Sequence, residues 1–174
     1  LGAGPGGYSA AFRAADLGMK VVLVERYATL GGVCLNVGCI PSKALLQSSE
    51  HLEAVQHKLD AHGIAVSGAK LDLPKMLARK DGIVSKMTKG IEFLFRKNKV
   101  TWLKGHGKLA GKSDIGYAIE VSGDASEVVA TKHVIIATGS KARHLPDVPV
   151  DNKLICDNEG ALSLSAVPKK LGVI

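Results

Sequence analysis

The sequence holds 174 residues, a length that suits one compact domain with a single core. Hydrophobic residues make up 46% and charged residues 22%, a balance that excludes a disordered chain. The net charge is +7, but the basic residues lie in scattered pairs and only 4% of residues are aromatic, so a solvated surface explains this charge better than a nucleic-acid or membrane partner.

The cysteine count and the length of the apolar runs indicate in which cellular compartment the protein is expected. Three cysteines are too few for a disulfide scaffold, so we expect a reducing, cytoplasmic environment. No run approaches the roughly 18 apolar residues of a membrane-spanning helix. No basic-then-apolar leader opens the sequence either, so we expect a soluble protein without a visible address.

The first elements predicted are a helix between Gly2 and Gly18 and a strand over residues 21–24 that closes on Glu25. Small apolar residues recur along the helix at a helical spacing: Ala10, Ala11, Ala14, Ala15 and Leu17. This is a β-α-β unit that lacks most of its first strand. Residues 170–174 resemble the opening of another strand, so we interpret the sequence as a piece of a longer protein, cut inside a strand at both ends.

The middle and the second half differ in pattern. A loop with Gly and Cys residues is expected first, then a helix from Pro41 to Gly63 and a second from Pro74 to Asn98, paired antiparallel. Short β-type runs follow at residues 100–103, 117–121, 127–130 and 133–137, before a connector at 145–150. The order predicts an α/β fold with a parallel sheet, a helical hairpin and a small antiparallel β segment.

The opening loop fits the pattern G-x-G-x-x-G through Gly2, Gly4 and Gly7. In this pattern the first glycine allows a tight turn, the second lets the backbone approach a pyrophosphate, and the third lets helix and strand pack closely. Glu25 follows about 20 residues later, where a carboxylate can accept a hydrogen bond from a ribose hydroxyl and would repel a 2′-phosphate. The alternative is an ordinary surface turn followed by a solvated glutamate.

The second motif holds Cys34 and Cys39, with Gly38 between them. Residues at this spacing can reach the Cα separation of a disulfide, about 4.4–6.8 Å. Cys39 begins a predicted helix, where a thiolate is stabilised, and Lys43 projects on the same face. A zinc site is disfavoured because Cys156 has no recognisable second partner, and the remaining alternative is a pair of buried structural thiols. Cys156 is expected to be a structural thiol, and the histidines are expected to be mostly solvated.

With these motifs the sequence resembles the FAD domain of the pyridine nucleotide-disulfide oxidoreductases, and above all their dihydrolipoamide dehydrogenase branch. The likeness rests on the glycine loop, on Glu25 and on residues 31–46, GGVCLNVGCIPSKALL, and extends to residues 137–140 and 167–174. The segment I-P-S-K at residues 40–43 departs from the V-P-K-K of glutathione reductase, whereas mercuric reductase shares P-S-K and remains a competitor. Val33, where many relatives have Thr, is a mild departure.

The resemblance implies a Rossmann-like FAD-binding domain with the redox-active cysteines over residues 1–145, and a connector over residues 146–174 that leads into an NAD-binding domain. Cys34 would exchange with the substrate and Cys39 would contact the isoalloxazine. Lys43 would lie near the flavin N5, and Gly107, or equally Gly105, near the adenine. The other implied cofactor-binding residues are Gly2, Gly4, Gly7, Glu25, Thr138, Gly139 and Ser140.

The implied reaction is oxidation of dihydrolipoyl groups with NAD, through the cysteine pair and FAD. The implied partners are the lipoyl-bearing acyltransferase of a 2-oxoacid dehydrogenase complex and a second copy in a homodimer. A competing hypothesis is a flavin-binding module without turnover, because the NAD site and the acid–base histidine are expected outside these residues.

Overall fold

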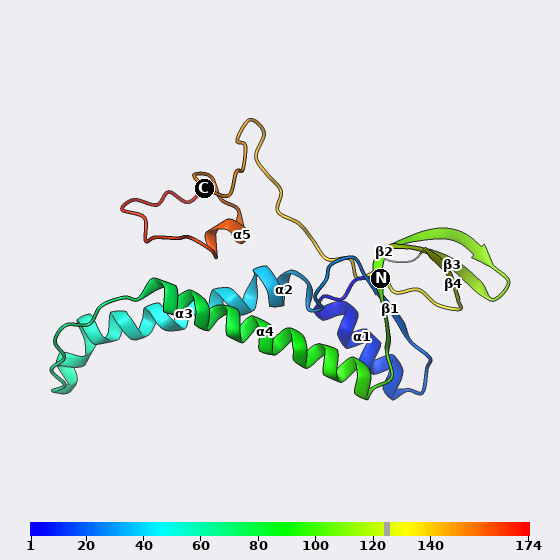
Figure 1. Ribbon diagram of the computed structural model, residues 1–174, viewed down its shortest axis with the longest axis horizontal. Coiled ribbons are helices and arrows are strands. Elements are labelled where there is room, and N and C mark those ends of the chain that lie inside the picture. Colours follow the sequence, from blue (N-terminus) through cyan, green and yellow to red (C-terminus); the bar gives the residue numbers. More distant parts are fainter. Residues whose placement is uncertain (124–125) are drawn as a thin grey trace. The chain divides into compact units, whose positions relative to one another are not determined.

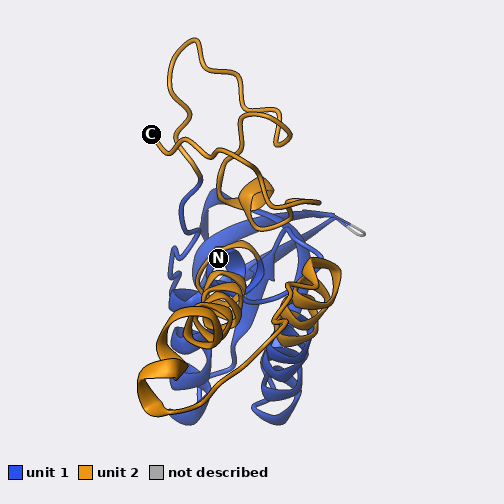
Figure 2. Ribbon diagram, turned by 90° about the vertical axis from the view of Figure 1, so that its left-hand side faces the viewer, with its two compact units in different colours: residues 1–36, 85–141 blue, residues 37–84, 142–174 orange. Residues whose placement is uncertain are grey.

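The computed structural model describes residues 1–123 and 126–174, and these divide into two compact units (Figure 2). Unit 1 comprises residues 1–36 and 85–141, and unit 2 comprises residues 37–84 and 142–174. Among the described residues, no helix combines the length and the apolar character needed to cross a membrane.

Unit 1 is an α/β arrangement built on one mixed sheet (Figure 1). Its sheet has the order β1-β2-β3-β4, with β1 (Val22–Glu25) parallel to β2 (Thr101–Ser113). The strands β2, β3 (Gly116–Gly123) and β4 (Glu127–Thr131) then form an antiparallel meander. The predicted α/β fold with a parallel pair and a small antiparallel segment is therefore confirmed.

Two apolar clusters hold unit 1 together. Val24, Ile119 and Val121 form a buried cluster. In β1 the residues Leu23 and Val24 are buried as predicted, whereas Val22 is exposed. Helix α1 (Pro5–Asp16) places Phe12 edge-on against Phe95 of α4 (Leu73–Lys97), with ring centroids 5.5 Å apart. Phe95 is 2% exposed, and burial of such a ring stabilises the unit by about 1.5–3 kcal/mol.

Unit 2 contains the predicted helical hairpin. Helix α3 (Cys39–Glu53) continues into a π-helical turn, η1 (Ala54–Lys58), and a 3₁₀ turn, η2 (Leu59–His62), and ends where Gly63 adopts φ +74°. Arg79 of α4 donates to the backbone oxygen of Ala44 at 3.0 Å and to the side-chain oxygen of Gln47. The planar guanidinium of Arg79 thus links α4 to α3 through two of its nitrogen atoms.

Four details differ from the sequence-based predictions. The expected Gly and Cys loop contains a short helix, α2 (Gly32–Val37). The predicted strand at 100–103 is only the start of β2, which extends to Ser113 and has a register shift between Leu109 and Gly111. A further short helix, α5 (Asn158–Ala161), was not predicted. Contrary to the prediction, the structure has no strand over residues 133–137; here Leu1 donates to Ile135 and accepts from Ala137. A one-residue partner is too short for a ladder.

Candidate functional site

The glycine-rich loop leads directly into α1, and no side chain donates or accepts a capping hydrogen bond at the start of this helix. Gly4 is the N-cap residue, no side chain caps this end, and Pro5 occupies the first turn without an N–H. The first N–H groups of a helix have no intrahelical acceptor, so those of the first turn of α1 are donors that an anion can use. The loop therefore has the local structure that the G-x-G-x-x-G pattern predicts.

The three glycines of this pattern differ in what surrounds them. A side chain at Gly2, where φ is +97°, would collide with the carbonyl of Ala137, and one at Gly7 would collide with the carbonyl of Gly2. Both glycines are thus required by the protein's own backbone packing. At Gly4 the nearest atom to an added Cβ is the Cα of Gly32, at 3.9 Å. Protein packing therefore does not require a glycine at position 4, and the pyrophosphate contact of Gly4 stays a prediction.

Glu25 is 6% exposed, and its carboxylate is held by backbone donors. The N–H of Ala3 donates to Oε2 at 2.7 Å, and the N–H of Tyr27 donates to Oε1 at 3.0 Å. This burial contradicts the alternative of a solvated glutamate. Each carboxylate oxygen keeps a second lone pair, so the predicted ribose contact stays a prediction that the geometry leaves room for.

The glycine pair Gly31 and Gly32 has a role that the sequence-based reasoning did not assign. The N–H of Gly31 donates to the carbonyl of Ala3 at 2.9 Å, and both glycines have positive φ, +106° and +58°. A Cβ at Gly32 would lie 2.6 Å from the Cα of Gly4. The pair lets the start of α2 lie directly on the glycine-rich loop, and two adjacent glycines after a buried strand were the available signal.

The remaining predicted cofactor positions of unit 1 lie in two places. Residues 138–140 follow Ala137 beside Gly2, and Gly139 has φ +71°. Gly107 lies in β2, where an added Cβ would come within 2.8 Å of Leu1 and 3.2 Å of Val24. Core packing therefore already accounts for Gly107, and its adenine contact stays a prediction, as do the contacts of Thr138 and Ser140.

The two motif cysteines occupy different helices. Cys34 is half-buried in α2 within unit 1, and Cys39 is exposed as the first residue of α3 within unit 2. The predicted placement of Cys39 at a helix N-terminus is confirmed. Gly38 precedes it without a side-chain cap, and the first turn holds no acidic residue, so the partial positive charge there is unopposed. The pairing of Cys34 with Cys39 stays a prediction.

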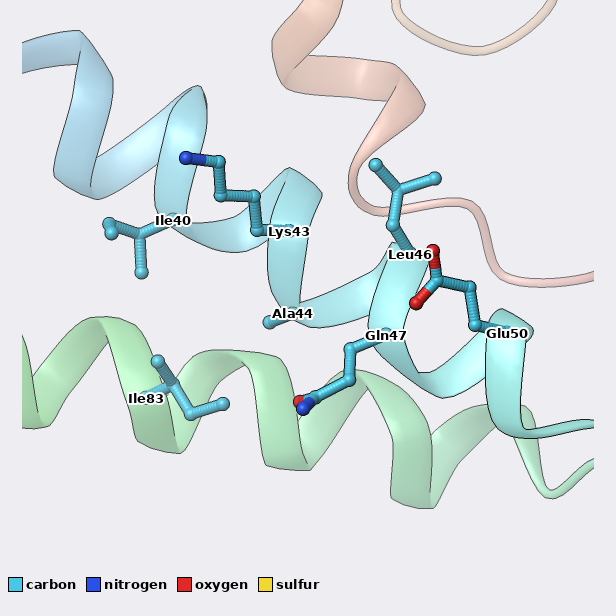
Figure 3. Close-up of a pocket in the computed structure, with 7 residues that line it drawn as sticks. All are labelled: Ile40, Lys43, Ala44, Leu46, Gln47, Glu50 and Ile83. Carbon is cyan, nitrogen blue, oxygen red and sulfur yellow. The ribbon is translucent and has the colours of Figure 1, made fainter.

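Lys43 follows on the exposed side of α3. An open depression on the helical hairpin is lined by Ile40, Lys43, Ala44, Leu46, Gln47, Glu50 and Ile83. In Figure 3 the ammonium of Lys43 extends toward the N-terminal end of the helix, on the side of Ile40, whereas Glu50 lies at the other end of the depression. Lys43 thus follows Cys39 by about one helical turn on α3.

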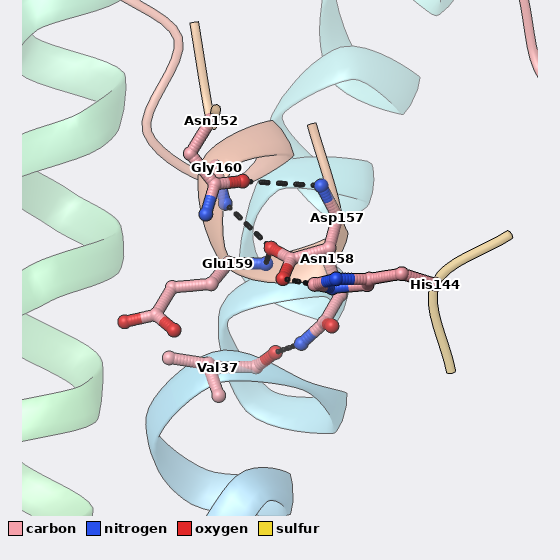
Figure 4. A network of polar contacts seen from close by, with 7 residues as sticks. All are labelled: Val37, His144, Asn152, Asp157, Asn158, Glu159 and Gly160. Atoms are coloured by element: carbon pink, nitrogen blue, oxygen red, sulfur yellow. Dashed lines mark hydrogen bonds and ion pairs between the residues drawn. The ribbon is translucent and has the colours of Figure 1, made fainter. Parts of the chain in front are cut away.

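The connector residues give two further outcomes. Cys156 is half-buried, with its sulfur 3.8 Å from the carbonyl of Lys153. His144 is exposed, as predicted for the histidines, and its Nε2 lies 3.5 Å from a carboxylate oxygen of Asp157 (Figure 4). Burial raises the pKa of Asp157, but backbone N–H donors at Gly160 and Glu159, together with His144, outweigh this effect and leave the pKa below its ordinary value.

Comparison with known proteins identifies relatives whose matches cover the whole chain. The family model described as pyridine nucleotide-disulphide oxidoreductase matches residues 1–174. A dihydrolipoyl dehydrogenase of Cupriavidus necator is 64% identical over 182 residues, which cover 100% of this chain and 38% of that protein. The mitochondrial dihydrolipoyl dehydrogenase 1 of Arabidopsis thaliana and a leghemoglobin reductase of Glycine max are each 51% identical over 174 residues. The chain spans 33–38% of the length of these three relatives.

A solved structure supports the fold. The crystal structure of LpdA from Mycobacterium tuberculosis superimposes with a TM-score of 0.85 at 23% sequence identity. The match covers 97% of this chain and 37% of that one.

Proposed function

The chain belongs to the pyridine nucleotide-disulphide oxidoreductase family, and from this premise we propose that it is the FAD-binding part of a dihydrolipoyl dehydrogenase. The observation that carries the proposal is a pair of helix N-termini without side-chain caps. One lies behind Gly4 and the other begins with Cys39. The first suits a pyrophosphate and the second suits a thiolate.

The glycine-rich loop holds the cofactor in this proposal. The free N–H donors of α1 bind the pyrophosphate, and the absence of a side chain at Gly4 lets it approach. The carboxylate of Glu25 holds the loop by accepting from the N–H of Ala3, and its remaining lone pairs would accept from the adenosine ribose. Lys43 would lie near the flavin ring, and Gly107 and residues 138–140 would line the rest of the cofactor. FAD, when bound, would supply a two-electron acceptor, and NAD would be held by a part of the full protein outside these residues.

The cysteine pair carries the thiol chemistry. A substrate thiolate attacks Sγ of Cys34, the bond between Cys34 and Cys39 breaks, and Cys39 leaves as a thiolate. The N-terminus of α3 would stabilise this thiolate, with Lys43 about one helical turn further along the same helix. The second substrate thiolate then displaces Cys34 from the mixed disulfide. The substrate departs as a disulfide, two electrons remain in the cysteine pair, one proton stays on Cys34 and the other is released.

The wider assignment rests on the resemblance of the sequence motifs to this family. We include in the proposal a lipoyl-bearing acyltransferase of a 2-oxoacid dehydrogenase complex as the partner, a homodimeric full protein and a cytoplasmic location. A flavin-binding module without turnover is the second candidate for these 174 residues alone. It is favoured by one observation, the 33–38% of each relative's length that the chain covers.

The test uses the full-length protein purified with its flavin. We expect NAD-dependent oxidation of dihydrolipoamide that Cys34→Ser and Cys39→Ser both abolish, while the control Cys156→Ser retains it. Cys34→Ser should keep a long-wavelength thiolate-to-flavin charge-transfer band when oxidised, and Cys39→Ser should lose it. Turnover that persists in either motif variant would refute the cysteine roles. A preference for glutathione disulfide or Hg²⁺ would move the protein to another branch of the family.

A further inference from the structure

The helix that carries Cys34 is too short to be stable by itself. Helix α2 has six residues, whereas an isolated helix needs about 12–15 residues to form in water. Two leucines of this segment are buried: Leu30, just before the helix, is 0% exposed, and Leu35, within it, is 3% exposed. Burial of apolar surface is non-directional, so the orientation of α2 also depends on its hydrogen bonds.

The side chain of Asn36 ties the last turn of α2 to its first turn and to the segment before it. Its Nδ2 donates to the carbonyl oxygen of Gly32 at 2.9 Å and to that of Leu30 at 3.1 Å. Its Oδ1 accepts from the hydroxyl of Thr29 at 2.9 Å. A side-chain amide has two N–H donors, so both are used here, and the two carbonyls require the nitrogen of the amide to face them. This orientation fixes the helix turn that contains Cys34.

The contact with Leu30 also reaches the glycine-rich loop. The carbonyl of Leu30 and the N–H of Gly31 belong to one peptide group. Asn36 binds the carbonyl side of this group, and the N–H side donates to the carbonyl of Ala3 at 2.9 Å. Ala3 is 0% exposed, and all of these residues lie in unit 1. One peptide group, held on both sides, thus joins the helix of Cys34 to the loop that is proposed to bind the pyrophosphate.

We propose, on the basis of the function proposed above, that Asn36 is a positioning residue for Cys34: it holds α2 on the glycine-rich loop and so keeps the Cys34 sulfur where the substrate thiolate attacks it. In that step the thiolate forms a bond to Sγ of Cys34 as the bond to Cys39 breaks, and Asn36 neither gives nor takes a proton. Misplacement of a reacting atom by about 1 Å can lower a rate by about a hundredfold. The contribution of Asn36 is therefore geometric.

The experiment compares Asn36→Ala with the parent in the full-length, flavin-loaded protein. Loss of two donated hydrogen bonds predicts a fall of about tenfold in kcat for dihydrolipoamide. In the reduced protein, freed of reductant and kept without oxygen, mass spectrometry after timed treatment with iodoacetamide follows the alkylation of each cysteine. Because α2 is held less firmly in the variant, the half-buried Cys34 should react about three- to tenfold faster, while Cys39, on another helix, should stay within about twofold.

Two further variants separate the donors of this amide from its acceptor. Asn36→Asp keeps the size of the side chain and the acceptor for Thr29, but turns a carboxylate oxygen toward the two carbonyls, so it should lower kcat at least as much as Asn36→Ala. Thr29→Val removes one bond from an exposed hydroxyl and should change kcat and the alkylation of Cys34 by about twofold. If neither Asn36 variant takes up flavin, Thr29→Val decides, and an unaltered ratio of Cys34 to Cys39 alkylation then overturns the proposal.

The matched control is Asn98→Ala. Asn98 lies in the same unit, is half-buried like Asn36, and its Nδ2 donates at 2.8 Å to the carbonyl four residues earlier, that of Leu94. It should leave kcat and the alkylation of Cys34 within about twofold of the parent, because this bond belongs to the end of α4 rather than to α2. Unchanged kcat and alkylation in flavin-loaded Asn36→Ala would overturn the proposal, as would an equal change in Asn98→Ala, since general loosening of unit 1 would then suffice. A parent protein that does not oxidise dihydrolipoamide would instead refute the proposed function.

Discussion

Removal of the Glu25 carboxylate tests how the glycine-rich loop is held. Glu25→Gln keeps one carbonyl oxygen for one of the two backbone donors and presents an NH₂ group to the other. A hydrogen bond to a charged group contributes about 1.5–3 kcal/mol, so we expect Glu25→Gln to lower the free energy of unfolding by about that amount. Glu25→Ala leaves the N–H groups of both Ala3 and Tyr27 without the carboxylate and should cost about 3–6 kcal/mol.

The assay is urea unfolding of the flavin-loaded full-length protein, followed by flavin fluorescence at saturating FAD. The matched control is Glu120→Gln, an exposed glutamate of β3 in the same unit. Surface substitutions of this kind stay within about 0.5 kcal/mol of the parent. If Glu25→Gln unfolds within that margin of Glu120→Gln, the two hydrogen bonds do not hold the loop and the reasoning from burial is wrong.

Three further predictions concern separate parts of the fold. Gly4→Val should weaken FAD binding by at least about tenfold, because a side chain there enters the space beside the helix start, whereas Gly82→Val, where an added Cβ meets no atom within 4 Å, should not; equilibrium dialysis with FAD distinguishes the two. Asp157 has a lowered pKa in the folded protein, so its contribution to stability is complete above the ordinary carboxyl pKa of about 4 and is lost as the pH falls through the lowered value. Asp157→Asn should therefore flatten the acid limb of the urea midpoint measured against pH, and an unaltered limb would contradict this assignment. Arg79→Lys should lower the melting temperature, because an ammonium cannot reproduce the planar fork that meets Ala44 and Gln47; a melting curve that coincides with that of the parent would show that the fork adds nothing.

Local patterns in the sequence were sufficient for α1, β1, the helical hairpin and the placement of the motif residues. The all-apolar run before Glu25 indicated a buried strand, and Pro74 indicated the first turn of a helix, as the structure has them. The spacing of Gly2, Gly4 and Gly7 indicated a loop entering a helix, and Cys39 was placed at a helix start. These features depend on periodicity and on the conformational limits of single residues, which neighbours in the chain already determine.

Contacts between distant segments were beyond such patterns. Residues 133–137 have the composition of a strand, but a strand also needs a paired partner, and the structure assigns no strand there. Whether Glu25 was solvated or buried depended on Ala3 coming within 2.7 Å of its carboxylate. A hydrogen bond from the side chain of Asn158 to the carbonyl of Val37 joins positions 121 residues apart. The order of residues sets which backbone conformation each segment prefers. Which polar groups meet depends on the fold, because a hydrogen bond needs a short donor–acceptor distance that residues far apart in the chain reach only on folding.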